Sequence, residues 1–108
     1  MRSGILVVAL LATVGQTAVA QTQTGAETRL KEKNIVLPAP PRPAGNYIQA
    51  VRVGNLLFLA GHGPDDQWRG RGKVGRDVTL EQGREAARSV GLRMLATTRE
   101  ALGSLDKV

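Results

Sequence analysis

The chain has no cysteine, one histidine, and one each of tryptophan, tyrosine and phenylalanine among its 108 residues. Without cysteine, no disulfide can stabilise the fold. His62, the single histidine, has no thiol or second imidazole to join it, so we predict that the chain binds no metal ion. A domain this short is marginally stable by itself, and we expect oligomerisation to supply the missing stability.

An apolar run long enough to cross a bilayer is also lacking at the N-terminus. The run at residues 4–14 falls short of the roughly 20 residues that a membrane span needs. It follows the positive charge of Arg2 and precedes Ala18-Val19-Ala20, the small-x-small pattern that signal peptidase cuts. We therefore predict a signal peptide over residues 1–20, cleavage after Ala20, and a periplasmic or secreted protein with no membrane anchor in its mature form.

Residues 21–44 are predicted to be a lead-in rather than part of the domain. Its first residues are small and polar, the composition of a disordered segment. The prolines at positions 38, 40, 41 and 43 then enforce an extended chain, because each fixes φ and disfavours a helical conformation in the residue before it. Two interpretations stay open: a stiff segment that packs across the sheet, or a docking motif for a partner that recognises proline-rich sequences.

Residues 47–60 have the pattern of a β-hairpin. Ile48 and Ala50 alternate with their neighbours, and Gly54-Asn55 supplies a tight turn between antiparallel strands. The second arm, residues 56–60, is apolar throughout. This pattern predicts a strand that is buried on both faces or lies in the middle of a sheet.

A helix is predicted to begin after Thr79, which forms a capping box with Gln82, and to stop at Gly103. The order of strand, strand, long helix predicts an α+β domain with a mixed sheet and helices packed on one face. One apolar stripe is expected to lie on the sheet; it contains Leu80, Ala87, Val90, Met94, Thr98 and Ala101.

The loop before this helix contains two patterns that we do not interpret as sites. Residues 70–75 match G-x-G-x-x-G, but no strand precedes them and the helix begins too late for a phosphate to sit on its N-terminus. Nucleic-acid binding is disfavoured, because one aromatic ring is not a stacking platform. The pattern that could suggest nucleic-acid binding is a cluster of four cations beside Trp68 in this loop: Arg69, Arg71, Lys73 and Arg76.

Several short motifs follow one another at fixed spacing. Gly45-Asn46-Tyr47 precedes Gln49-Ala50-Val51, then the Gly54-Asn55 turn, then Ala60-Gly61-His62-Gly63-Pro64. This stretch resembles the opening hairpin of the Rid (reactive intermediate deaminase) family, also called the YjgF or L-PSP endoribonuclease family, and the proline-rich lead-in resembles a less characterised branch of it. The resemblance implies a chorismate-mutase-like fold, a homotrimer, and a domain of which residues 45–108 are the N-terminal part.

The resemblance also implies a ligand cleft between subunits. The positions of Tyr47, Ala60, Gly61 and His62 match those that line it, while the family's carboxylate-holding arginine matches a position beyond Val108, so no catalytic residue is assigned here. For Tyr47, packing of the ring at a sheet edge stays open as the alternative. For His62, a general acid or base and a solvated loop residue both stay open, and the resemblance implies that this position shapes the mouth of the cleft rather than transferring protons. No organic cofactor is implied.

Two functions stay open on this basis. In the first, the protein binds small carboxylate or carbonyl compounds in its clefts and hydrolyses enamines and imines to keto acids. In the second, the same fold is a ligand-binding or interaction module without turnover. Ribonuclease activity is the least favoured.

Overall fold

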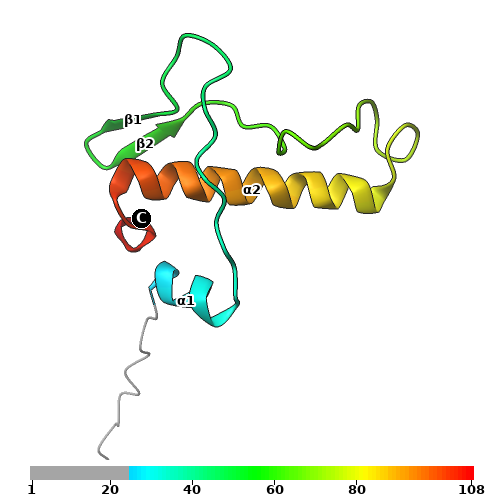
Figure 1. Ribbon diagram of the computed structural model, residues 1–108. Coiled ribbons are helices and arrows are strands. Elements are labelled where there is room, and N and C mark those ends of the chain that lie inside the picture. The colour runs from blue at the N-terminus through cyan, green and yellow to red at the C-terminus, as the bar shows by residue number, and fades with distance from the viewer. Residues whose placement is uncertain (1–24) are drawn as a thin grey trace, which may run out of the picture.

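The computed structural model describes residues 25–108, an α+β arrangement (Figure 1). In chain order its elements are helix α1 (Ala26–Glu32), strands β1 (Ala50–Val53) and β2 (Leu56–Leu59), helix α2 (Leu80–Leu102) and the short 3₁₀ helix η1 (Leu105–Lys107). The predicted signal peptide lies outside the described residues. Within residues 25–108, no helix combines the length and the apolar character needed to cross a membrane.

The two strands form the predicted hairpin. They are antiparallel, with Val51 opposite Phe58 and Arg52 opposite Leu57. Gly54 has φ of 59°, and Asn55 has no positive φ, so the first turn residue alone uses the left-handed region that favours glycine. The turn was therefore predictable from Gly54 and Asn55, although only Gly54 adopts a positive φ.

The second strand is not buried on both faces, which corrects the prediction for residues 56–60. Leu56 and Phe58 are 62% and 57% exposed, whereas Leu57 and Leu59 are half-buried. The reason is that α2 covers one face of the hairpin only (Figure 1). In the described part of the chain the sheet has two antiparallel strands, so the mixed sheet that we expected is not seen there.

Helix α2 begins and ends where its sequence predicts. The Thr79 side chain accepts a hydrogen bond from Gln82 N, and the Gln82 side chain accepts one from Thr79 N at 2.9 Å. At the other end Gly103 has φ of 78°, and its N–H donates to Arg99 O at 2.7 Å. These caps satisfy backbone groups that the helix ends would otherwise leave unpaired.

The buried side of α2 differs from the predicted stripe. Leu80 is 64% exposed and Met94 39% exposed, while Ala96 and Thr97 are 3% and 1% exposed. The hairpin packs on one side of α2, and the extended segment after α1 runs across a different side of the same helix (Figure 1). The buried residues of α2 therefore lie in two narrow strips and not on one broad face.

Helix α1 is joined to the C-terminal end of α2 by charged groups. Glu27 accepts from Arg99 Nη2 at 2.6 Å, from Arg99 Nε at 3.0 Å and from Leu105 N at 3.0 Å. The pKa of the Glu27 carboxyl is lowered below its usual value, mainly by the hydrogen bonds from the Arg99 guanidinium and next by the hydrogen bond from Leu105 N. Glu27 N in turn donates to Asp106 Oδ1 at 3.0 Å. We call this set of contacts the α1 latch; Leu30 and Leu105 are buried beside it.

Candidate functional site

The four residues assigned from sequence lie beyond one end of the hairpin. Ala60 N donates to Gln49 O at 2.9 Å, which extends the strand pairing by one step past β1 and β2. Tyr47 is 45% exposed, and its hydroxyl accepts from Ala44 N at 3.2 Å. A Cβ on Gly61 would meet no neighbour within 4 Å, so the backbone there is open on that side. No hydrogen bond joins Tyr47 to His62 among residues 25–108.

Both ring nitrogens of His62 are engaged by the protein. Nδ1 lies 2.7 Å from Ala60 O, and Nε2 lies 2.8 Å from Thr97 Oγ1. A carbonyl oxygen only accepts, so Nδ1 carries the proton, and in the neutral ring Nε2 accepts from the Thr97 hydroxyl. His62 therefore fastens the start of the loop after β2 to the buried Thr97 of α2. The sequence places these two residues 35 positions apart and gives no signal for the pair.

The loop that His62 fastens leads into a groove of about 700 Å³. One side of the groove is the extended proline-rich segment, residues 36–42, which we call the strap; the other side is the middle of α2 and the loop after β2. We call this space the strap groove. Its residues on α2 and the loop are Asp65, Asp66, Glu85, Arg88, Ser89, Leu92 and Arg93.

Arg93 is the most enclosed cation of the strap groove, with 16% of its side chain exposed. Its Nη1 donates to Pro64 O at 3.0 Å and lies 3.6 Å from Asp66 Oδ1. Its Nε is buried and has no hydrogen-bond partner in the part of the chain that the structure describes. The guanidinium is thus held in place with donor capacity unused.

Asp65 and Ser89 tie the loop to α2 on the same side of the groove. Ser89 Oγ donates to Asp65 Oδ2 at 2.9 Å and accepts from Asp65 N at 3.1 Å. The Ser89 hydroxyl, and after it the Gln67 N–H, lower the pKa of the Asp65 carboxyl below its usual value. Asp65 is therefore ionised at neutral pH, and its charge is already solvated by protein donors.

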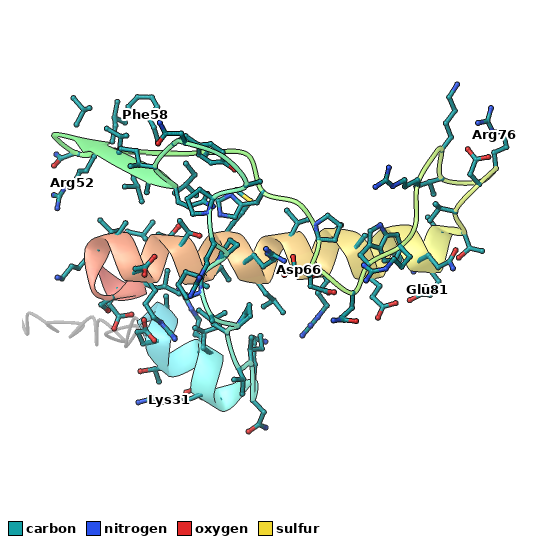
Figure 2. All side chains as sticks on the ribbon, turned by 45° about the horizontal axis from the view of Figure 1, so that its top comes forward. Lys31, Arg52, Phe58, Asp66, Arg76 and Glu81 are labelled. Carbon is teal, nitrogen blue, oxygen red and sulfur yellow. The ribbon has the colours of Figure 1, made fainter. Side chains whose placement is uncertain are left out.

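The glycine-rich loop before α2 forms a separate unit at the far end of the helix (Figure 2). Asp77 accepts from Lys73 N at 2.8 Å and from Arg76 Nη2 at 2.7 Å. The Arg76 guanidinium, and after it the Lys73 N–H, lower the pKa of the Asp77 carboxyl. Helix α2 begins at Leu80, after the G-x-G-x-x-G residues, so the helix N-terminus does not open within the motif. Residues 25–108 bring together no group of three or more His, Cys, Asp or Glu side chains that could hold a metal ion.

Comparison with known proteins gives one informative relative. The chain is similar to a Trypanosoma cruzi protein named Protein TCP17, with 36% identity over 81 residues, which are 73% of this chain and 51% of the relative. The chain thus spans about half the length of that curated relative. No protein-family model matches the chain, and no solved structure matches it.

These findings correct the family assignment made from the hairpin. The relative's name does not indicate a Rid or YjgF protein, and no family model supports one. The identification as a Rid, YjgF or L-PSP protein is therefore wrong, and the deaminase activity, the homotrimer and the chorismate-mutase-like fold implied by it lose their basis. Neither the comparisons nor the described residues support the signal peptide, whose residues lie outside the described part.

The physical reason for the error lies in what the motifs encode. A Gly-Asn turn, a strand with alternating polarity and an apolar partner strand ending at glycine are what any tight hairpin packed on a helix requires. The hairpin itself is present, with the turn where the motifs place it. The pattern therefore identified a piece of structure and not a family.

Proposed function

We propose that this chain is a module that binds small organic carboxylates in the strap groove and does not transform them. The observation that carries the proposal is the set of three guanidinium groups lining one groove: Arg42 from the strap, and Arg88 and Arg93 from α2. Guanidinium groups match the geometry of a carboxylate, because two parallel N–H donors can meet its two oxygens. The groove volume, about 700 Å³, lies in the range of small-molecule sites.

The state of each arginine supports the proposal. Arg42 and Arg88 form no ion pair within residues 25–108, so their charges are available to a ligand. Arg93 has a buried Nε without a partner, and an unsatisfied buried donor is unfavourable. A small shift of the guanidinium that opened this donor to a ligand carboxylate would remove that penalty, which gives Arg93 the central role in binding.

The acidic residues of the groove select among carboxylates. Asp65 is engaged by Ser89 and Gln67 N, whereas Glu85 has no ion-pair partner among the residues described. The Glu85 carboxylate can attract an amine on the ligand, so carboxylates that also bear an amine are accommodated beside small monocarboxylates.

Binding without turnover is supported by the groups that a reaction would need. His62 has both nitrogens engaged by Ala60 and Thr97, and Ser89 donates its hydroxyl proton to an ionised carboxylate. Neither arrangement provides a serine hydroxyl held by a free imidazole base, the pairing that activates a serine nucleophile.

Isothermal titration calorimetry with 2-oxobutanoate tests this function, with the methyl ester of the same acid as the uncharged control. The wild-type chain should bind the acid and not the ester. Arg88→Gln should weaken binding about tenfold, the effect of losing one charged hydrogen-bonding group. Arg71→Gln removes the same charge from the glycine-rich loop, outside the groove, and should leave binding unchanged. Equal affinity for acid and ester would contradict the proposal.

We also propose that the hairpin belongs to a wider mixed sheet with α2 on one face. Support comes from its two outer edges, which pair with no other strand within residues 25–108, because a hairpin of two strands is marginally stable by itself in water. Amide hydrogen exchange tests this: slow exchange along both outer edges of the hairpin is expected. Fast exchange along both edges would exclude further paired strands.

A further inference from the structure

A second pocket, of about 480 Å³, lies between the hairpin and the C-terminal end of α2. Its apolar wall includes Leu57 and Leu59 of β2 and Leu102 of α2, all half-buried. The inner face of the hairpin and α2 are in contact here, so the wall belongs to the packed part of the molecule. We call this space the hairpin pocket; it shares no lining residue with the strap groove.

The hairpin pocket carries two positive charges from different elements. Arg52 stands opposite Leu57 in the strand register and therefore on the inner face, whereas Phe58 is on the outer face (Figure 2). Lys107 comes from η1. Arg52 Nε donates to Gly54 O at 2.9 Å, and Lys107 Nζ donates to Leu102 O at 2.8 Å. Each cation keeps further donors, because a guanidinium has five and an ammonium three.

Among the described residues, the one negative group in the pocket lining is the α-carboxylate of Val108 in the 108-residue chain, and it forms no ion pair with either cation. The lining includes no Asp or Glu in the part of the chain that the structure describes, and neither Arg52 nor Lys107 forms an ion pair there. The strap groove differs, because its three arginines stand among three acidic residues. The hairpin pocket thus combines an apolar wall with a rim that carries two cationic side chains and no acidic one in the described part of the chain.

We propose that the hairpin pocket binds the aliphatic chain of a medium-chain fatty acid, with the carboxylate held between Arg52 and Lys107. Both parts of the ligand are specified by the lining: leucine side chains bury the methylene groups, and the two cations attract the head group. This inference does not rest on the proposed function of the strap groove, since it concerns another site and another class of acid.

Calorimetric titration of the 108-residue chain with butanoate, hexanoate and octanoate tests the apolar part. Affinity should rise about threefold to fourfold for each added methylene, as expected when the chain leaves water. Octanol, which has a similar tail and no charge, should bind at least severalfold more weakly than octanoate. An affinity that does not depend on chain length, or no binding of octanoate at all, overturns the proposal.

Variants test the charged part. The double substitution Arg52→Gln and Lys107→Gln should weaken octanoate about tenfold and leave octanol unchanged, since only the charged contacts are lost. Arg52→Lys keeps the charge and should retain most of the affinity. Lys107→Gln removes one exposed side chain and its hydrogen bond to Leu102 O, and circular dichroism checks that the fold is kept. Arg71→Gln is the matched control. Unchanged octanoate binding in the double variant, or an equal loss of octanol, would overturn the assignment of the head group.

Discussion

Single residues connect the loop after β2 to helix α2. Thr97 is 1% exposed, and its hydroxyl is the partner of His62 Nε2 at 2.8 Å. His62 also donates to Ala60 O, so one imidazole bridges the end of a strand and the middle of a helix. This bridge positions the loop that forms one wall of the strap groove.

Thr97→Val is expected to destabilise the fold by about 1–2 kcal/mol, because valine has the same shape and leaves a half-buried ring nitrogen without its partner. Urea unfolding followed by circular dichroism measures the change. Thr98→Val is the matched control: Thr98 donates to Met94 O within its own helix turn, and its loss should have a smaller effect. An equal effect of both substitutions would argue against the bridge.

Only some residues of the candidate site could be predicted from the sequence. His62 was recognised as chemically distinctive, but its partner Thr97 was not, because no pattern links a loop residue to a helix residue 35 positions away. No sequence pattern indicated that the strap would form one groove with Arg88 and Arg93. The position of an extended segment depends on long-range packing, which local sequence does not encode.

The helices and strands follow from local signals. The Thr79–Gln82 capping box, the Gly103 stop and the Gly54 turn each act within a few residues, and the structure has all three. The exposure of the strands did not follow, because the two faces of an apolar strand are distinguished by what covers them and not by their own residues. Leu56 and Leu57 are the same amino acid with opposite surroundings.

Thr79→Ala is expected to lower the stability by about 1 kcal/mol, since it removes the side-chain acceptor for Gln82 N at the start of α2. Thermal unfolding followed by circular dichroism at 222 nm gives the measurement. Thr79→Ser keeps the hydroxyl and should restore most of the stability. If serine were no better than alanine, the capping box would not be contributing.

The α1 latch joins the first and last described elements. Glu27 accepts from Arg99 and from Leu105 N, and Asp106 accepts from Glu27 N. Since only three residues separate the end of α1 from the strap, the latch also fixes one end of the strap groove. Opening of the latch should therefore loosen the strap.

The latch predicts a specific dependence of stability on pH. The pKa of Glu27 is lower in the folded chain, so its contribution is complete above the ordinary glutamate pKa of about 4.3 and is lost as pH falls through the lower folded value. Glu27→Gln should therefore lower the urea midpoint at pH 7 and match the wild type near pH 2. Glu32→Gln, a substitution in the same helix outside the latch, is the control. A difference that persists unchanged at low pH would contradict an ionic latch.

The location of a small carboxylate bound to the chain can be measured directly. In a ¹H–¹⁵N NMR titration with 2-oxobutanoate, we expect the largest shifts at the amides of Ser89, Leu92 and Arg93 and at the Arg93 Nε–H signal, and we expect these shifts to disappear in Arg93→Lys. Shifts concentrated at Leu57, Leu59 and Leu102, at Tyr47 and Gly61, or at no residue would show that the strap groove does not bind the carboxylate.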